Sequence, residues 1–267
     1  MLQRHMQRCP ESIVGGHRGA MISISQGQNA AIVVRGLTKR FGAQEVLRGV
    51  DVSMHFGEVV ALMGPNGSGK STLIKSIVGL VRPDGGSIHV AGHQVYGDVS
   101  YRRSVGYMPQ IARYPETLTV AELFHMLTQL RSECNDYDLQ LFEQLNIGSF
   151  ASKQLGVLSG GQRQRVGAAL AWYFSPTILL LDEPTAGLDP ISTETIKAKI
   201  ARERAQGKCL VITTHSPHDA LELADRLVYL YEGEIWIDLP LEQLLDNAAT
   251  TSLMGAIAWH LQQESTQ

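Results

Sequence analysis

Short apolar runs separated by glycines begin at Ile32 and predict a series of strands. In the first half of the chain these strands lie at 32–34, 49–54, 58–63, 87–90 and 104–108. The third run is apolar without alternation from Val59 to Met63. Such a pattern is typical of a strand buried on both faces, so a sheet covered on both sides is expected.

Helical spacing replaces the strand pattern in the middle of the chain. Within 120–130 and 138–145, apolar residues recur every three or four positions, as in an amphipathic helix. The strand pattern then returns, with helices between its first members. The predicted strands are 177–182, 209–214, 226–231 and 234–237, and the helices are 192–206 and 217–224. This order predicts an α/β fold with a mainly parallel sheet and an inserted helical subdomain at about 115–173.

The two ends of the chain lack this regular alternation. Residues 1–30 contain no continuous apolar segment, so we expect a disordered extension there rather than a secretory signal. At the other end, 241–267 is expected to be a short tail with an amphipathic piece at 241–245 and an apolar piece at 253–261. Capping of the core and contact with a partner both remain open for this tail.

Composition and charge narrow the class of protein. The chain has 267 residues, of which 44% are hydrophobic and 18% are charged, as in a globular domain with a sizeable core. With 23 basic and 26 acidic residues the formal net charge is −3, so nucleic acid is not expected as a partner. The cysteines Cys9, Cys134 and Cys209 show no CxxC spacing, which disfavours a disulfide framework and a zinc site. No apolar stretch approaches the ~20 residues that a membrane-spanning helix needs.

A glycine-rich segment follows the buried strand and precedes a run with helical spacing. It fits the pattern G-x-x-x-x-G-K-[ST], and its residues are Gly64, Pro65, Asn66, Gly67, Ser68, Gly69, Lys70, Ser71 and Thr72. In such a loop the backbone N–H groups turn toward a phosphate, the lysine neutralises phosphate oxygens and the hydroxyl after it binds Mg²⁺. Lys70 and Ser71 are the predicted holders of phosphate and metal.

Two acidic residues end a second buried strand. The apolar positions 178–181 lead directly to Asp182 and Glu183. Because an unpaired buried carboxylate is costly, packing gives no reason for an acid there. Together with the phosphate loop the pair predicts a nucleotide hydrolysis site, in which Asp182 holds Mg²⁺ and Glu183 polarises the attacking water.

The string Leu158-Ser159-Gly160-Gly161-Gln162-Arg163-Gln164-Arg165 is the most diagnostic in the chain. It resembles the signature motif of ATP-binding cassette (ABC) ATPases, and the resemblance covers about 31–240. Read locally, Ser159 is equally good as a simple helix N-cap. As a signature motif, the small residues leave free N–H groups at a helix start that receive an anion. The resemblance implies that Ser159, Gly160, Gly161 and Gln162 contact nucleotide.

The resemblance extends to four further positions of this sequence. Phe41 matches the aromatic that stacks on adenine, and Gln110 matches the glutamine that reaches Mg²⁺ or the attacking water. Asp189 matches the D-loop at the dimer seam, and His215 matches the switch histidine that contacts the γ-phosphate. With Glu183, His215 and Gln110 are therefore the expected catalytic residues. Ser71, Gln110 and Asp182 are the expected metal ligands.

The resemblance to this family implies a fold and a set of partners. The expected architecture is a P-loop NTPase core with an N-terminal antiparallel β part and the inserted helical subdomain, spanning 31–240. ATP and Mg²⁺ are the expected ligands, and a second copy of the chain completes each ATP site because one chain carries one signature and one phosphate loop. A separate transmembrane permease is the expected partner, which places the protein at the cytoplasmic face of the inner membrane.

Two questions remain about the work that ATP hydrolysis drives: whether the protein takes part in transport, and which cargo is transported. A soluble ABC protein without a transport role usually carries two cassettes or a coiled-coil insertion, and the interval from Lys70 to Ser159 contains no heptad run. For the cargo, the segment 106–116, together with Asp189-Pro190 and 221–228, resembles ATPases encoded with nitrous-oxide-reductase maturation systems. In that family the complex supplies the enzyme's copper-sulfide centre. A generic multidrug-type or haem-type exporter ATPase is the alternative.

Overall fold

The computed structural model describes residues 29–131 and 136–264. The expected disordered extension over 1–30 lies outside these residues except for Asn29 and Ala30, and Ala30 already begins the first strand. The cysteines Cys9 and Cys134 also lie outside the described residues.

A six-stranded sheet forms the centre of the molecule, in the order β10-β9-β3-β8-β7-β6. All its neighbouring strands are parallel except β10, which runs antiparallel to β9. This arrangement confirms the predicted mainly parallel sheet. Its strands are β3 (Val59–Met63), β6 (Val105–Met108), β7 (Ile178–Asp182), β8 (Cys209–Thr213), β9 (Arg226–Tyr231) and β10 (Glu234–Pro240).

The two faces of this sheet belong to two hydrophobic clusters. Along β3, Val59 and Ala61 join one cluster, whereas Val60 and Leu62 join the other. Because successive side chains of a strand point to opposite faces, the unbroken apolar run predicted from the sequence fills both cores. Helix α1 (Lys70–Ile77) packs into the second cluster together with the antiparallel sheet described next.

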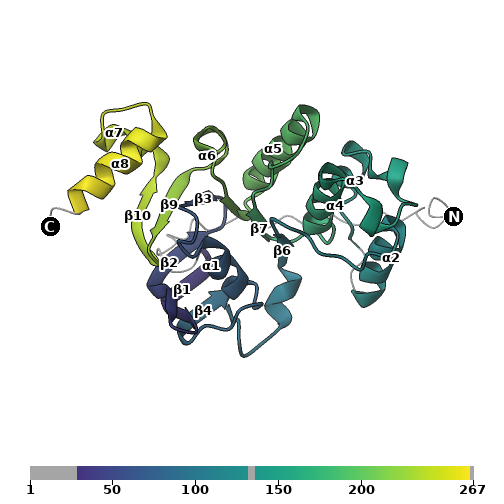
Figure 1. Ribbon diagram of the computed structural model, residues 1–267, viewed down its shortest axis with the longest axis horizontal. Coiled ribbons are helices and arrows are strands. Elements are labelled where there is room, and N and C mark those ends of the chain that lie inside the picture. The colour runs from purple at the N-terminus through teal and green to yellow at the C-terminus, as the bar shows by residue number, and fades with distance from the viewer. Residues whose placement is uncertain (1–28, 132–135, 265–267) are drawn as a thin grey trace, which may run out of the picture.

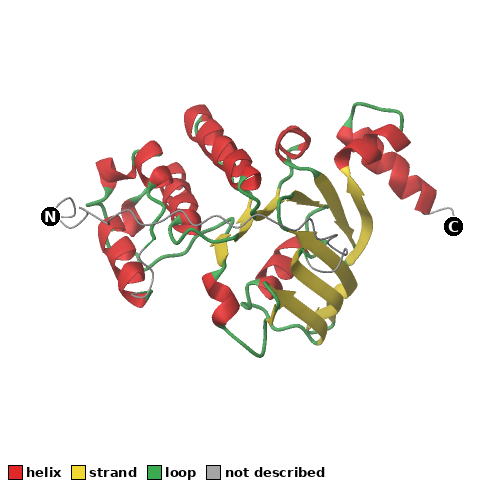
Figure 2. Cartoon of the chain, turned by 180° about the vertical axis from the view of Figure 1, so that it is seen from behind, coloured by secondary structure: helices red, strands yellow, loops and turns green. Residues whose placement is uncertain are grey.

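A separate antiparallel sheet lies beside the central one, in the order β2-β1-β4-β5 (Figure 2). Its strands are β1 (Ala30–Phe41), β2 (Gln44–His55), β4 (Gly85–Val90) and β5 (His93–Gln94). Strands β1 and β2 are longer than the sequence pattern predicted. Register shifts between Val34 and Leu37 interrupt the alternation, because a bulge changes which face the next side chain occupies.

The helical part predicted between the sheets' strands gathers at one end of the molecule (Figure 1). It contains α2 (Val120–Leu130), α3 (Gln140–Gln144) and α4 (Gly160–Trp172), with 3₁₀ turns at Ile147–Phe150 and Leu155–Val157. A third 3₁₀ turn, Ser100–Arg103, precedes β6. Phe124 packs edge-on against Phe142 and Tyr173, with ring centroids 5.1 and 5.0 Å apart. This aromatic contact joins the three helices.

One helix follows each of β7 and β8, and within the described residues two more follow the last strand, β10. Helix α5 (Pro190–Ala205) separates β7 from β8, and α6 (Pro217–Leu223) separates β8 from β9. Helices α7 (Leu241–Asn247) and α8 (Leu253–Glu264) then fold back onto β10, and their buried residues include Leu244, Leu253 and Ile257. Within its described part, up to Glu264, the expected tail is therefore a helical cap on the edge of the sheet.

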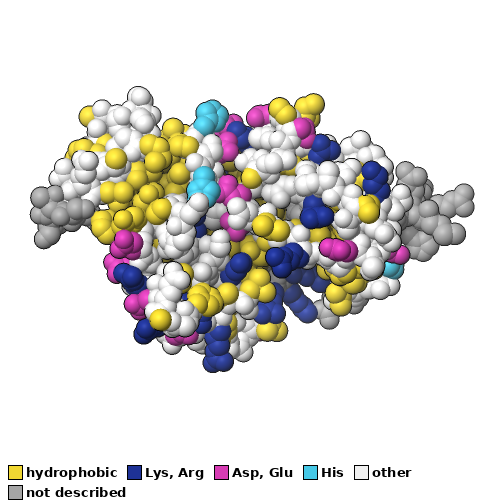
Figure 3. Space-filling view, in the orientation of Figure 1, with side chains coloured by type: hydrophobic (Ala, Val, Ile, Leu, Met, Phe, Trp, Pro, Cys, Tyr) yellow, Lys and Arg dark blue, Asp and Glu magenta, His cyan; other side chains and the backbone are white. Residues whose placement is uncertain are grey.

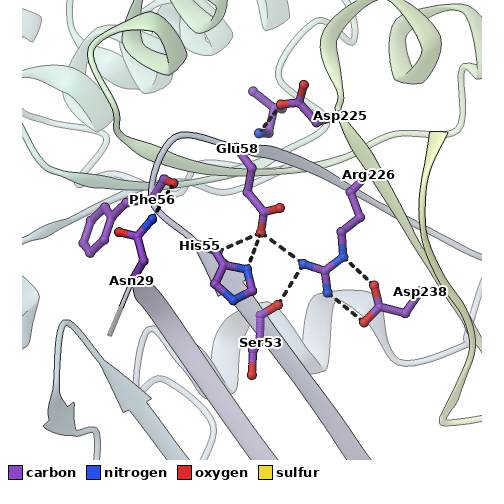
Figure 4. A network of polar contacts seen from close by, with 9 residues as sticks. Asn29, Ser53, His55, Phe56, Glu58, Asp225, Arg226 and Asp238 are labelled. Atoms are coloured by element: carbon purple, nitrogen blue, oxygen red, sulfur yellow. Dashed lines mark hydrogen bonds and ion pairs between the residues drawn. The ribbon is translucent and has the colours of Figure 1, made fainter. Parts of the chain in front are cut away.

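A polar network joins the two sheets at the end where β3 and β9 begin (Figure 4). The Arg226 guanidinium donates to both Asp238 oxygens at 2.5 and 2.7 Å and to Glu58 at 3.1 Å. It also donates to the Ser53 carbonyl oxygen on β2 at 3.0 Å. The network links the start of β9 to β2, to β10 and to the residue before β3. The phosphate loop follows the opposite end of β3.

No helix among residues 29–131 and 136–264 combines the length and apolarity needed to cross a membrane.

Candidate functional site

The phosphate loop runs from the end of β3 into α1, and two of its glycines are required by geometry. Gly64 has φ +144, and a Cβ there would lie 2.0 Å from the Leu230 carbonyl oxygen. Gly69 has φ +110, and a Cβ there would lie 2.8 Å from Leu47 Cδ2. Both the positive φ and the lack of space exclude a side chain at these positions. The sequence pattern therefore reflects the path of the backbone.

Lys70 is the first residue of α1 and is only 8% exposed. Its Nζ donates hydrogen bonds to the carbonyl oxygens of Gly64 at 2.7 Å and Pro65 at 2.9 Å. Burial lowers its pKa, and the nearby carboxylates of Glu183 and Asp182 partly offset this effect. Within the described chain no side chain caps the first turn of α1. Its free N–H groups and the ammonium group together form an anion site.

The predicted residues from distant parts of the chain line one cavity of about 280 Å³. Its lining residues are Gln44, Val46, Asn66, Gly67, Gly69, Lys70, Ser71, Thr72, Gln110, Asp182, Glu183, Thr213 and His215. The space-filling view shows acidic and histidine side chains close together in the upper part of one face, where Figure 1 labels α6 (Figure 3). Among the residues that line the cavity, Gln44 and Val46 on β2 were not predicted from the sequence, because neither belongs to a recognisable motif.

Thr213 connects the two acidic residues and was also missed from the sequence. Asp182 is 5% exposed, and its Oδ1 accepts a hydrogen bond from Thr213 Oγ1 at 2.5 Å. The same Oγ1 accepts the N–H of Glu183 at 3.0 Å. The available signal was a polar residue at the end of the apolar run 209–213. Thr213 thereby orients one carboxylate and holds the backbone of the next.

Glu183 and His215 lie next to each other in the lining of the cavity. His215 Nε2 lies 3.3 Å from Glu183 Oε1, and the histidine side chain is half exposed. Burial raises the pKa of the Glu183 carboxyl; His215 lowers it and Asp182 raises it further. A carboxyl with a raised pKa is a stronger proton acceptor than an ordinary glutamate. This pair is suited to accept and hold a proton.

Three oxygen-bearing side chains in the cavity have the chemistry of a magnesium site. Ser71, Gln110 and Asp182 present a hydroxyl, an amide and a carboxylate. Mg²⁺ prefers such oxygen ligands and keeps several waters. Asp182 uses Oδ1 for its hydrogen bond with Thr213, and its other carboxylate oxygen is the one that would bind the metal. The donor set therefore fits the metal that the sequence predicts.

Other predicted residues lie outside this cavity. Phe41 ends β1 and is 51% exposed, with Lys39 Nζ 5.3 Å from its ring centroid. Gly64, Pro65 and Ser68 belong to the loop but do not line the cavity. The signature residues Ser159, Gly160, Gly161 and Gln162 stand at the start of α4, in the helical part of the molecule (Figure 1).

Ser159 caps α4 in the way that its local sequence allows. Its hydroxyl accepts the Gln162 N–H at 3.2 Å, and the Gln162 side chain accepts the Ser159 N–H at 3.1 Å. This capping box satisfies one N–H of the helix. The N–H groups of Gly160 and Gly161 belong to the same first turn, where an intrahelical partner is lacking. The capping interpretation and the anion-binding interpretation are thus compatible.

Asp189 has a structural task at the start of α5. Its side chain accepts the Ser192 N–H at 3.0 Å and the Ser192 hydroxyl at 2.6 Å, and it forms an ion pair with Arg165 of α4. The hydrogen bonds from Ser192, followed by Arg165, hold the pKa of this carboxyl well below its usual range. Pro190 occupies the first helical position, so the dipeptide Asp-Pro is a helix start.

Comparison with known proteins agrees with this geometry. The sequence family described as "ABC transporter" matches residues 47–186. An uncharacterized ABC transporter ATP-binding protein of Rhizobium meliloti is 37% identical over 215 residues, which cover 78% of this chain and 79% of that protein. The lipopolysaccharide export system ATP-binding protein LptB of Haemophilus influenzae is 33% identical, over 81% of this chain and 93% of LptB.

Solved structures show the same architecture. The ATP binding subunit of an ABC transporter aligns with a TM-score of 0.80 and 28% identity over 86% of this chain and 99% of that chain. The dimeric post-hydrolysis cassette MJ0796, bound to ADP and Pi, aligns with a TM-score of 0.69 and 28% identity over 79% of this chain and 98% of its own. The chain described here therefore belongs to the ABC transporter family, as an ATP-binding subunit that hydrolyses ATP.

Proposed function

We propose that the cavity beside Lys70 is the ATP hydrolysis site of a transporter motor. The observation that carries this proposal is the convergence of the phosphate loop with Gln110, Glu183 and His215 on one cavity. The loop N–H groups and Lys70 bind the phosphates, and Ser71, Gln110 and Asp182 hold Mg²⁺ in this assignment. When bound, the metal neutralises charge on phosphate oxygens.

In this proposal the chain's own residues move one proton and orient one water. Glu183 accepts the proton of the attacking water, because its raised pKa makes it a ready base. Gln110 orients that water. His215, which lies next to Glu183, contacts the γ-phosphate. Thr213 keeps Asp182 and the Glu183 backbone in place. The buried position of Lys70 restricts water around the phosphates.

The complete site is proposed to need two copies of the chain. The similar cassette MJ0796 is dimeric in its post-hydrolysis state. The signature residues do not line the cavity of their own chain, which supports their capping the ATP of the partner. Phe41 is assigned to stack on adenine; its half-exposed ring leaves a face for a base. Asp189, anchored at the start of α5, is assigned to the seam between the copies.

The proposed domain organisation follows from these assignments. The ATPase domain comprises 31–240, with the helical subdomain at about 115–173, and 241–267 completes the chain. A separate permease would dock on the helical subdomain and on the residues after Gln110, 111–130, which would place the motor at the cytoplasmic face of the inner membrane. The exposed Ile111, directly after Gln110, supports this docking face.

Removal of Mg²⁺ tests the hydrolysis site. The purified chain is expected to release phosphate from ATP when Mg²⁺ is present, and EDTA in excess should lower the rate at least about 100-fold. Binding of a fluorescent ATP analogue should persist in EDTA, because Lys70 and the loop N–H groups remain. A phosphate release rate unaffected by EDTA would contradict the assignment of Ser71, Gln110 and Asp182.

For the cargo, we propose maturation of nitrous oxide reductase through supply of its copper-sulfide centre. The support is the resemblance of 106–116, which begins on β6 and continues past Gln110 toward the proposed docking face. A general exporter of the multidrug or haem type is the second candidate, favoured by the similarity to an export ATPase.

Deletion of the gene separates the two candidates. In a denitrifying host, loss of the maturation motor should leave nitrous oxide reductase without the absorption bands of its copper centres. Complementation with the wild-type gene should restore them, whereas a Glu183→Gln gene should not. A fully metallated reductase in the deletion strain would refute the maturation role and favour the general exporter.

A further inference from the structure

The start of α4 contacts the segment that follows the catalytic strand through two side chains, and its backbone passes close to that segment at Gly161. A Cβ at Gly161 would lie 3.4 Å from the Gly187 carbonyl oxygen. Gln164 Nε2 donates a hydrogen bond to the Glu183 carbonyl oxygen at 3.1 Å. Arg165 forms its ion pair with Asp189. The segment 183–189 is thus held at its beginning and at its end by two side chains of the signature helix.

The backbone at Glu183 is strained, so its surroundings determine its orientation. Glu183 has φ +54, a left-handed conformation that is unfavourable for a non-glycine residue. Its N–H donates to Thr213 on β8. Its carbonyl oxygen accepts the Ala186 N–H at 3.2 Å and the Gln164 side chain. The core sheet holds one side of this residue, and the signature helix holds the other.

We propose that Gln164 is a positioning residue, which fixes the peptide of Glu183 and makes the catalytic carboxylate depend on the position of the signature helix. This inference rests on the proposed composite site, in which the signature caps the nucleotide of the second copy. A shift of α4 at that seam would move Nε2 of Gln164, and the strained peptide would follow because rotation of φ and ψ is its softest motion. Gln164 then connects occupancy of one ATP site to catalysis at the other.

The hydrogen bond is tested by two substitutions of similar reach. Gln164→Met removes the N–H donor with little change in length, and Gln164→His restores a ring N–H donor. In Gln164→Met we expect kcat for MgATP to fall about tenfold, the effect of one lost hydrogen bond. KM and the affinity for a fluorescent ATP analogue should stay within about twofold, since no residue of the phosphate loop is altered. Gln164→His should recover most of kcat.

The matched control is Gln243→Met, because Gln243 is an exposed glutamine on α7. Its kcat and KM should equal those of the wild type. An unchanged kcat in Gln164→Met would overturn the proposal. Equal losses in Gln164→Met and Gln164→His would also overturn it, because packing of the helix rather than the donor would then be responsible. Glu183→Gln in the same assay separates the two levels: an active Glu183→Gln refutes the hydrolysis site itself.

A double-mutant cycle tests the connection to the signature. If Gln164 transmits the effect of the signature to Glu183, the kcat losses of Ser159→Ala and Gln164→Met should not multiply, and the double variant should resemble the more impaired single variant within about threefold. Losses that multiply within about twofold would show independent action and overturn the coupling. The hydrogen bond to Glu183 would then serve only its own site.

Discussion

Replacing Lys70 by alanine is expected to lower the affinity for ATP at least about 100-fold, because a charge-assisted contact to phosphate is lost from a buried site. The Lys70 ammonium group donates to the carbonyl oxygens of Gly64 and Pro65. Phosphate oxygens must take over these bonds when ATP enters. Equilibrium titration of Lys70→Ala with a fluorescent ATP analogue measures the loss.

The matched control for this variant lies on the same helix. Lys75 is in α1 but exposed, so Lys75→Ala should bind the analogue as the wild type does. Lys70→Ala should remain folded, since Lys70 is the first residue of α1 and alanine is the residue most compatible with a helix. An affinity within about threefold of the wild type would remove Lys70 from the phosphate site.

The sequence predicted those parts of the site that consecutive residues encode. The phosphate loop could be recognised because its glycines meet local backbone requirements, as Gly64 and Gly69 demonstrate. The pair Asp182 and Glu183 could be recognised because two acids after a buried apolar run have no packing role. In both cases the physical constraint acts on a few consecutive residues, so the motif can be recognised from the sequence alone.

The residues that the sequence did not identify act across the fold. Thr213 bonds to Asp182 across 31 positions of the chain, and Gln164 reaches Glu183 across 19. Thr213 ends an apolar run and Gln164 belongs to the signature string, but neither pattern indicates the partner of the side chain. The parallel pairing of β7 with β8 and the packing of α4 create these contacts. The extent of β1 was missed for a related reason: a bulge interrupts the alternation from which strands are predicted.

The position of the signature residues cannot be explained from the cavity of a single chain. Its residues cap α4 and stand outside the cavity, although the resemblance assigns them to nucleotide binding. A composite site reconciles these observations, because residues that belong to one site need not meet within one copy. The dimeric relative bound to ADP and Pi supports that arrangement.

Replacing Glu183 by glutamine is expected to lower kcat at least about 100-fold while ATP binding is retained, because an amide keeps the shape but cannot accept the proton. The neighbours that define the site, Thr213 and Gln164, bind the backbone of Glu183 and not its side chain. They should therefore hold the glutamine in the same place. Without turnover, ATP-bound dimer should accumulate and elute earlier than monomer on size-exclusion chromatography.

The pH dependence of hydrolysis distinguishes a base from a merely structural carboxylate. Burial raises the pKa of Glu183, so the wild-type kcat should fall on acidification at a higher pH than an ordinary glutamate would give. The residual activity of Glu183→Gln should lack this acid limb, since no carboxyl titrates there. Glu194→Gln on the exposed side of α5 should keep both rate and limb. Near wild-type turnover in Glu183→Gln would refute the base assignment, and a variant that remains monomeric with ATP would refute the composite dimer.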